Sequence, residues 1–271
     1  MNHWRLIIHP PYNGAWNMAV DEAILESVST KTQLPTLRLY DWFPYTLSLG
    51  HAQPVADVNI SALNKNNWTL VRRPTGGRAI LHADEMTYSV CAPTDEPAIS
   101  GGVLESYQKI SNALLLALEI VGITADSKKK NTSDSGLTHD PVCFQYPSDY
   151  EITFHEKKLI GSAQARKKNG VLQHGSIPLF GDITRIIEVL NFSDETSRQD
   201  AKNRLLQRAT TIKNSLGKAI SWFEFASAIS QGFRQKLDID FVNSSLTKME
   251  LARAVQIFHE KFANDSWTLR I

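Results

Sequence analysis

The chain has 271 residues, 42% of them hydrophobic and 21% charged, with 14 glycines and 11 prolines. These proportions are typical of a globular protein and exclude collagen-like, low-complexity and disulfide-rich classes. The 29 Lys and Arg residues nearly balance the 28 Asp and Glu residues, and the resulting net charge of +1 argues against a protein that binds nucleic acid or a membrane surface over a broad face.

The lengths of the apolar runs and the number of cysteines exclude further classes of protein. No run approaches the ~18–20 apolar residues of a membrane span, and the first ten residues are too short in apolar run for a signal peptide. The two cysteines, Cys91 and Cys143, cannot form a disulfide framework or a cysteine-rich zinc site. We therefore expect a cytoplasmic protein that binds no metal, no nucleic acid and no membrane.

Hydrophobic spacing predicts mixed helices and strands over the first two thirds of the chain. Residues 1–10 indicate a first strand, and residues 14–30 place Met18, Ile24 and Val28 on one helical stripe. The other predicted elements are strands over 36–41, 45–50 and 68–72, a helix over 103–121, and strands over 150–154, 158–165 and 171–179.

Two regions depart from this pattern. Residues 124–142 are polar and turn-rich, which predicts a mobile loop. The last third is rich in helix signals, with capping-box spacing from Ser221 to Glu224 and from Thr247 to Glu250. We expect one mixed α/β domain over residues 1–271, and a mostly helical C-terminal portion over 182–271 is left open. The final helix carries an apolar stripe of Leu251, Val255, Phe258 and Phe262.

The first segment that can carry chemistry is a glycine pair, Gly76 and Gly77, between two predicted strands. It is followed by no helix, so it is neither a P-loop nor a dinucleotide fingerprint. One interpretation is a hairpin turn with three exposed arginines. The other is an anion or thioester cradle, in which backbone amides and Arg72, Arg73 and Arg78 face a phosphate group.

The second segment contains Cys143, which directly follows the polar loop. A lone cysteine is most often a small buried hydrophobe, and Cys91 fits that description at the end of a strand-like run. A catalytic cysteine needs nearby positive charge, because the thiolate is the nucleophile and the free thiol has a pKa of about 8.5. Lys157 and Lys158 lie near the expected turn between two strands, which would place one lysine beside the sheet. His174 is either a base or a structural histidine.

Six segments together resemble the lipoate–protein ligase and biotin ligase catalytic-domain family, and within it the octanoyltransferases that modify the glycine cleavage H protein. Lipoate ligases have a third glycine where this chain has Arg78, and in the transferases a Cys-Phe pair precedes the family lysine by the same fifteen residues that separate Cys143 from Lys158. The six segments are 16–22, 72–79, 143–144, 158–164, 174–179 and 262–267.

The resemblance implies a mixed, largely antiparallel sheet backed by helices and an acyl transfer without ATP. Cys143 would take an octanoyl group from acyl carrier protein as a thioester and pass it to a lysine of a lipoyl-domain protein such as glycine cleavage H protein. Lys158 would favour the Cys143 thiolate. The residues that the resemblance implies for substrate binding are Arg72, Arg73, Thr75, Gly76, Gly77, Arg78, His82, Gly161, Ser162, Ala163 and His174.

Two alternatives stay open from the sequence. In an ATP-dependent lipoate–protein ligase, which would need ATP and Mg²⁺, Lys158 would contact an acyl-adenylate and Cys143 would be incidental. In the second alternative, the chain is a non-catalytic scaffold that binds lipoyl domains.

Overall fold

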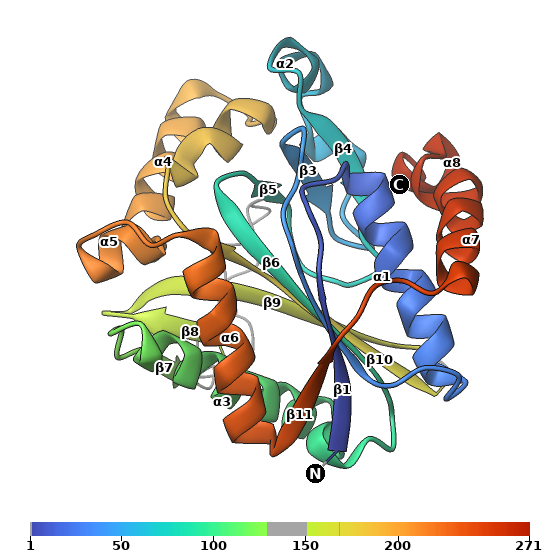
Figure 1. Cartoon of the computed structure of the whole chain (residues 1–271). Coiled ribbons are helices and arrows are strands. Elements are labelled where there is room, and N and C mark those ends of the chain that lie inside the picture. The colour runs from blue at the N-terminus through green and yellow to red at the C-terminus, as the bar shows by residue number, and fades with distance from the viewer. Residues whose placement is uncertain (1, 129–150, 168) are drawn as a thin grey trace.

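The computed structural model describes residues 2–128, 151–167 and 169–271 (Figure 1). An eight-stranded sheet has the order β11-β1-β2-β6-β10-β9-β8-β7, and a three-stranded sheet has the order β4-β3-β5. The strands are β1 (Asn2–Ile8), β2 (Thr36–Tyr40), β3 (Thr46–Leu49), β4 (Thr69–Arg72), β5 (Ile80–His82), β6 (Glu85–Pro93), β7 (Asp126–Lys128), β8 (Glu151–Phe154), β9 (Lys157–Lys167), β10 (Gly170–Pro178) and β11 (Ile239–Asn243).

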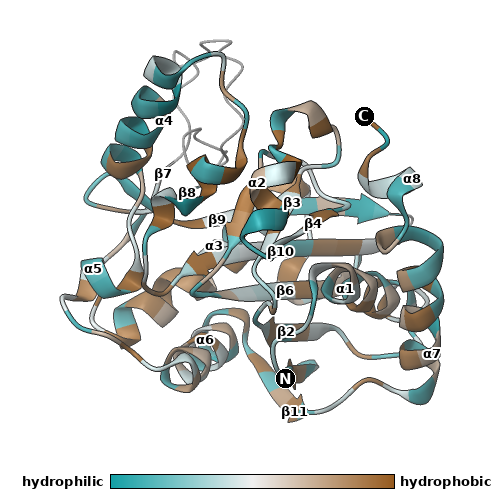
Figure 2. Ribbon diagram, turned by 90° about the horizontal axis from the view of Figure 1, so that it is seen from above, coloured by the Kyte–Doolittle hydropathy of each residue, from teal (hydrophilic) through white to brown (hydrophobic). Residues whose placement is uncertain are grey.

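The helices are α1 (Gly14–Ser29), α2 (Ile60–Lys65), α3 (Val103–Ile120), α4 (Glu195–Arg208), α5 (Ile212–Leu216), α6 (Trp222–Leu237), α7 (Lys248–Ile257) and α8 (Asp265–Thr268). Helices α3 and α6 pack on one face of the larger sheet and α1 and α7 on the other, whereas α2 and α4 pack against the smaller sheet. Figure 2 shows α4, at the rim of the molecule, as mostly hydrophilic. None of the helices in the described residues combines the length and the apolar content that crossing a bilayer requires.

Alternation along the strands explains why the sheet has a helical layer on each side. In β2, Leu37 and Leu39 join the core cluster that contains α3 and α6, whereas Tyr40 joins the cluster that contains α1 and α7. Successive side chains of a strand point to opposite faces, so a strand with apolar residues on both faces contributes to two cores at once. The predicted fold class is confirmed: apart from the parallel pairs of β1 with β2 and β11, the larger sheet is antiparallel.

The hairpin interpretation of the glycine segment is wrong. Strands β4 and β5 flank the glycines as expected, but they do not pair with each other, because β3 lies between them. The expectation that its arginines are exposed also fails for Arg72 and Arg73, which are 0% and 3% exposed. The segment therefore crosses over β3 as a loop between two outer strands.

Two boundaries differ from the sequence prediction. Within the polar stretch 124–142, residues Asp126–Lys128 form the edge strand β7, and the rest from residue 129 lies outside the described residues. The turn between β8 and β9 consists of His155 and Glu156, both at positive φ, so Lys157 begins the strand instead of occupying the turn. This shift leaves Lys158 as the second residue of β9.

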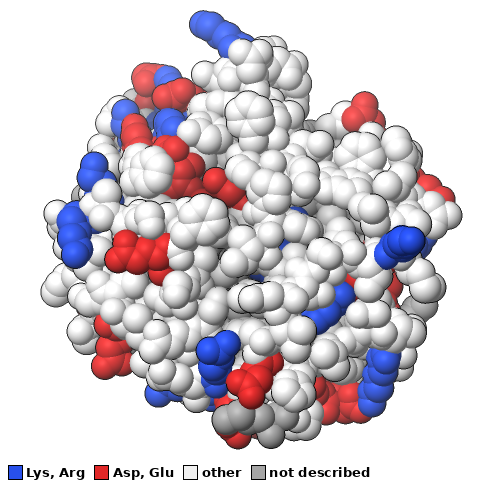
Figure 3. Space-filling model, viewed as in Figure 1, with Lys and Arg blue, Asp and Glu red and all other residues white. Residues whose placement is uncertain are grey.

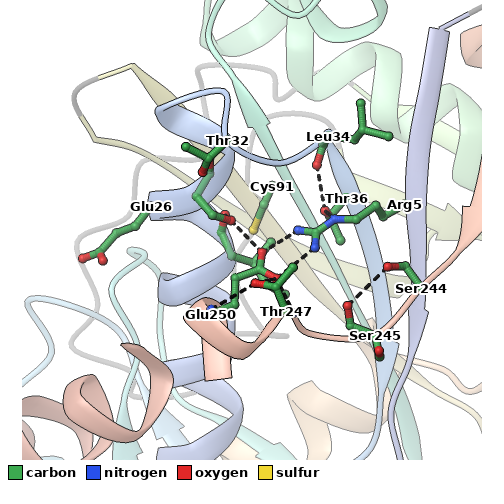
Figure 4. Close-up of polar contacts among 12 residues, drawn as sticks. Arg5, Glu26, Thr32, Leu34, Thr36, Cys91, Ser244, Ser245, Thr247 and Glu250 are labelled. Carbon is green, nitrogen blue, oxygen red and sulfur yellow. Dashed lines mark hydrogen bonds and ion pairs between the residues drawn. The ribbon is translucent and has the colours of Figure 1, made fainter. Parts of the chain in front are cut away.

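The C-terminal portion is joined to the first strand by pairing and by a buried ion pair (Figure 4). Strand β11 pairs in parallel with β1, and the residue after it, Ser244, donates its backbone N–H to the carbonyl of Leu6. Arg5 of β1 donates from both terminal nitrogens to the Glu250 carboxylate at the start of α7, at 2.9 and 2.6 Å. Ser27 of α1 donates to the same carboxylate at 2.6 Å.

This ion pair explains why the apolar stripe predicted for the last helix is wrong in part. Glu250 and Ala254 form the buried side of α7, while Leu251 and Val255 are 47% and 44% exposed. Phe262 is buried as the stripe suggested. A charged residue with a partner 245 positions away thus takes the inward position that hydrophobicity alone assigns to leucine and valine.

Replacing Glu250 by Gln is expected to lower the free energy of unfolding by about 3–5 kcal/mol, because it leaves the Arg5 guanidinium buried without a counter-charge. Burial raises the pKa of Glu250, but the hydrogen bonds from Arg5 and Ser27 outweigh it and hold the pKa below its usual value. The stabilisation is therefore complete above the unfolded-state pKa and is lost as pH falls through the folded-state pKa.

Urea unfolding between pH 7 and pH 3 tests this expectation. The exposed Glu260, changed to Gln, is the matched control and should shift stability by less than about 0.5 kcal/mol. If Glu250→Gln and Glu260→Gln had the same stability at pH 7, the ion pair would not be what holds α7 to the sheet.

Candidate active site

A cavity of about 380 Å³ lies between the glycine loop, the first turns of α3, and strands β9 and β10. Four of the residues that line it are exposed to solvent: Gly76 and Gly77 of the glycine loop, and Val103 and Leu104 of α3, which are 51% and 45% exposed. Ten of the predicted site residues line it: Arg73, Gly76, Gly77, Arg78, His82, Lys158, Gly161, Ser162, Ala163 and His174.

Two predicted binding residues face elsewhere. The guanidinium of Arg72 donates to backbone carbonyls of the 50–53 turn and, at 3.1 Å, to the carbonyl of Thr268 in α8. Its own carbonyl accepts from the indole N–H of Trp267 at 2.8 Å. Arg72 thus fastens the C-terminal helix to β4, whereas Thr75 contacts the site indirectly, through His174.

Arg73 fixes the backbone of the glycine loop through hydrogen bonds. Its guanidinium donates to the carbonyls of Gly76 at 2.9 Å and Arg78 at 2.7 Å, and also to the carbonyl and hydroxyl of Ser48. Gly77 adopts a φ of +94°, and its carbonyl lies so close to Gly50 that a Cβ there would be 1.9 Å from the oxygen. The loop is therefore held rigidly, with one wall open to the cavity.

Lys158 lies in the cavity wall and is 3% exposed. Its ammonium is 2.5 Å from a carboxylate oxygen of Glu151, on the neighbouring strand β8. The hairpin of β8 and β9 thus carries a buried ion pair at the site, and the sequence prediction that one lysine lies beside the sheet agrees with this position. The partner Glu151 was not among the predicted residues.

His174 connects the glycine loop to α1. Its Nε2 is 2.6 Å from the Thr75 hydroxyl, and its Nδ1 is 3.7 Å from a carboxylate oxygen of Asp21. Burial lowers the pKa of His174, which favours the neutral ring. A neutral ring that donates from Nδ1 toward Asp21 can accept from the Thr75 hydroxyl at Nε2. Burial also raises the pKa of Asp21, but Arg38 at 2.7 Å and His174 outweigh it, and the net pKa is lowered. An ionised Asp21 therefore orients the ring.

His82 belongs to a second buried network. Its Nε2 is 2.8 Å from the Ser48 hydroxyl, its Nδ1 is 2.8 Å from Glu85, and its ring stacks on Trp42 with centroids 3.9 Å apart. The neighbouring Asp84 lies at a φ of +52° and accepts a hydrogen bond from Tyr45, which does not line the cavity. Glu85 is thus the carboxylate that holds His82.

The structure describes only one of the two cysteines. Cys143, the predicted nucleophile, lies outside the described residues. Cys91 is 1% exposed, and burial raises the pKa of its thiol well above the usual value. The prediction that Cys91 is a packed core residue is confirmed.

Eleven residues of the cavity wall were not predicted from the sequence, and four of these lie inside segments already singled out. Met18 is part of the α1 segment, and Gln164 and Ser176 belong to segments on β9 and β10. Trp42, Ser48 and Thr87 gave no local signal. The other missed lining residues are Ile80, Val103, Leu104, Tyr107 and Gly175.

The lining determines which chemistry the cavity can host. Within the described part of the chain, none of its lining residues is Asp or Glu, while Arg73, Arg78 and Lys158 are cationic. The buried side chains of Met18, Trp42 and Ile80 provide an apolar interior. No group of three or more His, Cys, Asp or Glu residues in the described ranges could hold a metal ion. The cavity therefore suits a ligand with an apolar chain and, at one end of that chain, a carbonyl oxygen or a negatively charged group.

Variants of the two glycines distinguish an effect on substrate binding from an effect on stability. A Cβ at Gly76 would meet no atom within 4 Å, so Gly76→Val should leave the melting temperature nearly unchanged. The added side chain would stand in the open cavity wall, and activity should fall about 10- to 100-fold. Gly77→Ala should instead lose about 1–3 kcal/mol of stability, because its φ of +94° strains any L side chain.

Thermal unfolding and steady-state transfer assays on both variants check this prediction. Loss of stability in Gly76→Val, or full activity with a stable fold, would contradict the placement of the loop at the substrate face.

Comparison with known proteins agrees with this picture. Residues 13–234 match the family described as the lipoyl protein ligase A/B catalytic domain. The chain is 38% identical to the octanoyltransferase LipM of Brevibacillus brevis and also 38% identical to that of Carboxydothermus hydrogenoformans, in each case over 100% of both chains. The prediction of an acyltransferase agrees with the names of these relatives.

Solved structures give the same fold. A bipartite lipoate protein ligase from Thermoplasma acidophilum superposes with a TM-score of 0.84 at 24% identity, covering 99% of this chain and 97% of that one. A lipoate-protein ligase A bound with ATP gives 0.79 at 25% identity, covering 99% of both. The matched family model spans most of the chain, and relatives above 30% identity cover all of it, so this chain belongs to the lipoyl protein ligase A/B catalytic domain family.

Proposed function

We propose that the chain is a cytoplasmic octanoyltransferase of lipoate biosynthesis that works through a Cys143 thioester. Octanoyl–acyl carrier protein is the donor, and a lysine of a lipoyl-domain protein such as glycine cleavage H protein is the acceptor. Cys143 attacks the thioester carbonyl, and the carrier thiol leaves. The acceptor amine then attacks the acyl-cysteine, which releases the Cys143 thiolate and forms the amide. No ATP is needed, because an amide forms downhill from a thioester.

The observation that carries the proposal is the full-length 38% identity to octanoyltransferases. The site supports it in two ways. An apolar cavity is suited to a saturated acyl chain, and the ammonium of Lys158 lies in its wall. A cation near a thiol favours the thiolate, which is the reactive form.

A second function has its own supporting observation. A structure of a lipoate-protein ligase A bound with ATP superposes on this chain at 25% identity. In an ATP-dependent ligase, a buried lysine beside the acyl cavity would stabilise an acyl-adenylate instead of a thiolate. The two functions differ in whether a covalent acyl-enzyme forms.

Mass spectrometry of the intact protein tests both. Incubated with octanoyl–acyl carrier protein alone, the protein should gain one octanoyl group on Cys143 that hydroxylamine removes. Adding a lipoyl-domain acceptor should discharge it without ATP. A protein that stays unmodified with this donor, but transfers free octanoate when ATP and Mg²⁺ are added, is a ligase. A protein that binds the acceptor and transfers from neither donor is a scaffold.

A further inference from the structure

The three arginines of the glycine segment have different surroundings. Arg72 is bonded to carbonyls outside the cavity, and the guanidinium of Arg73 donates to loop carbonyls and to Ser48. Both side chains are at least 97% buried and hold the backbone in place. Most of their N–H donors are therefore bonded to the fold, and a ligand would have to displace these bonds to reach them. The Nη2 of Arg72 has no hydrogen-bond acceptor among the described residues, but it is buried, and Arg72 does not line the cavity.

Arg78 is different. It lines the cavity and is only partly buried, and no described residue forms a hydrogen bond or ion pair with its guanidinium. The loop carbonyl of Arg78 is fixed by Arg73 at 2.7 Å, so the backbone that carries this side chain is held in place. A guanidinium on a rigid backbone loses less entropy when it binds a ligand than one on a mobile loop.

The charge around Arg78 favours an anion. None of the described residues that line the cavity is Asp or Glu, and Lys158 already has Glu151 as its partner. On the face of the molecule that Figure 3 shows, charges of both signs are scattered without an extended patch of either sign. The positive charge at the cavity comes from Arg73, Arg78 and Lys158 in its lining, and a compact anion fits so small a group better than a broad acidic surface does.

We propose that Arg78 binds the phosphate group of the arm that carries the donor thioester. This inference rests on the proposed function, since it assumes a thioester donor. The acyl chain lies among the apolar side chains of the cavity, and the arm leaves past the exposed Gly76 and Gly77, which brings it beside Arg78. A thioester carbonyl is neutral, so the phosphate is the negative charge that such a donor offers. A guanidinium binds phosphate through two parallel hydrogen bonds.

Two synthetic donors that differ only in the phosphate test the assignment: S-octanoyl-pantetheine and S-octanoyl-4′-phosphopantetheine. Wild-type protein should show a higher kcat/KM for the phosphorylated donor. Arg78→Gln should reduce this preference about 10- to 100-fold, the usual effect of a hydrogen bond between charged groups. Arg78→Lys should restore part of it, and the exposed Lys218, changed to Gln, is the control with the same change in net charge.

Each result decides the matter. An Arg78→Gln variant that keeps the wild-type preference, or that loses both donors equally, overturns the phosphate assignment and leaves the transferase intact. Wild-type protein that transfers neither from these donors nor from octanoyl–acyl carrier protein overturns the proposed function and this inference together. If only octanoyl–acyl carrier protein is used, an Arg78→Gln variant with the wild-type kcat/KM for that donor overturns this inference alone. Octanoyl–acyl carrier protein and octanoyl-coenzyme A both carry a phosphoryl group at this position of the arm, as a phosphodiester and as a diphosphate, and the larger loss in Arg78→Gln identifies which of them the site serves.

Discussion

Cys143→Ser is expected to abolish octanoyl transfer, with at least about a 1,000-fold loss of turnover, because an alcohol without a dedicated base is a poor nucleophile toward a thioester. The thiol is partly ionised at neutral pH, with a free pKa of about 8.5, whereas a serine hydroxyl stays protonated. The variant should keep the wild-type melting temperature, since the replacement is nearly isosteric. Transfer to a lipoyl-domain acceptor, followed by mass spectrometry of the acceptor, measures the loss.

Cys91→Ser is the matched control. Cys91 is buried against α1, and its thiol has a raised pKa, so this variant should change stability more than chemistry. Near wild-type turnover in Cys143→Ser would mean that no acyl-cysteine lies on the pathway, and the ligase would become the better description.

Lys158→Ala should reduce transfer about 100-fold and raise the pKa of the Cys143 thiol by roughly one to three pH units, because an ammonium close to a thiolate stabilises its charge. Glu151→Gln should have the opposite effect on the thiol. It removes the carboxylate 2.5 Å from the ammonium and leaves the Lys158 charge uncompensated by that partner. The rate of iodoacetamide alkylation as a function of pH reports the thiol pKa in each variant.

Lys157→Ala serves as the control for charge, because its ammonium binds the carbonyl of Leu206, outside the cavity lining. Alkylation profiles that coincide for wild type, Lys158→Ala and Glu151→Gln would remove Lys158 from thiol activation. Thermal unfolding of all three variants separates this result from simple loss of the buried ion pair.

The sequence predicted those helices and strands whose apolar residues follow a regular spacing within the element itself. The helix over 14–30 and the strands over 36–41 and 171–179 were found because their apolar residues recur at the spacing of one element. Strand β11 was missed, because a short, partly polar run becomes a strand only by pairing with β1, more than 200 residues earlier. Likewise, the insertion of β3 between β4 and β5 depends on pairing that no local window contains.

Site residues could be predicted where the residue type alone suggests a chemical role, as for Lys158 and His174. The prediction failed where the fold buries a residue type that usually lies at the surface. Arginine is almost never fully buried without partners, so one interpretation of the sequence placed Arg72 and Arg73 at the surface and the other placed them facing a phosphate group. Their partners are backbone carbonyls at the ends of strands and in turns. These carbonyls come within hydrogen-bonding distance of the guanidinium groups only once the chain has folded.

The pairing of β1 with β11 also has a consequence during synthesis on the ribosome. Strand β1 is made first, but its outer partner begins at Ile239. At roughly 5–20 residues per second, β1 waits about 10–50 s with one edge of its backbone unpaired. An exposed strand edge is a template for pairing with other chains. A nascent chain that stalls before residue 239 would therefore aggregate more readily than the finished protein, and it would depend on chaperones that cover such edges.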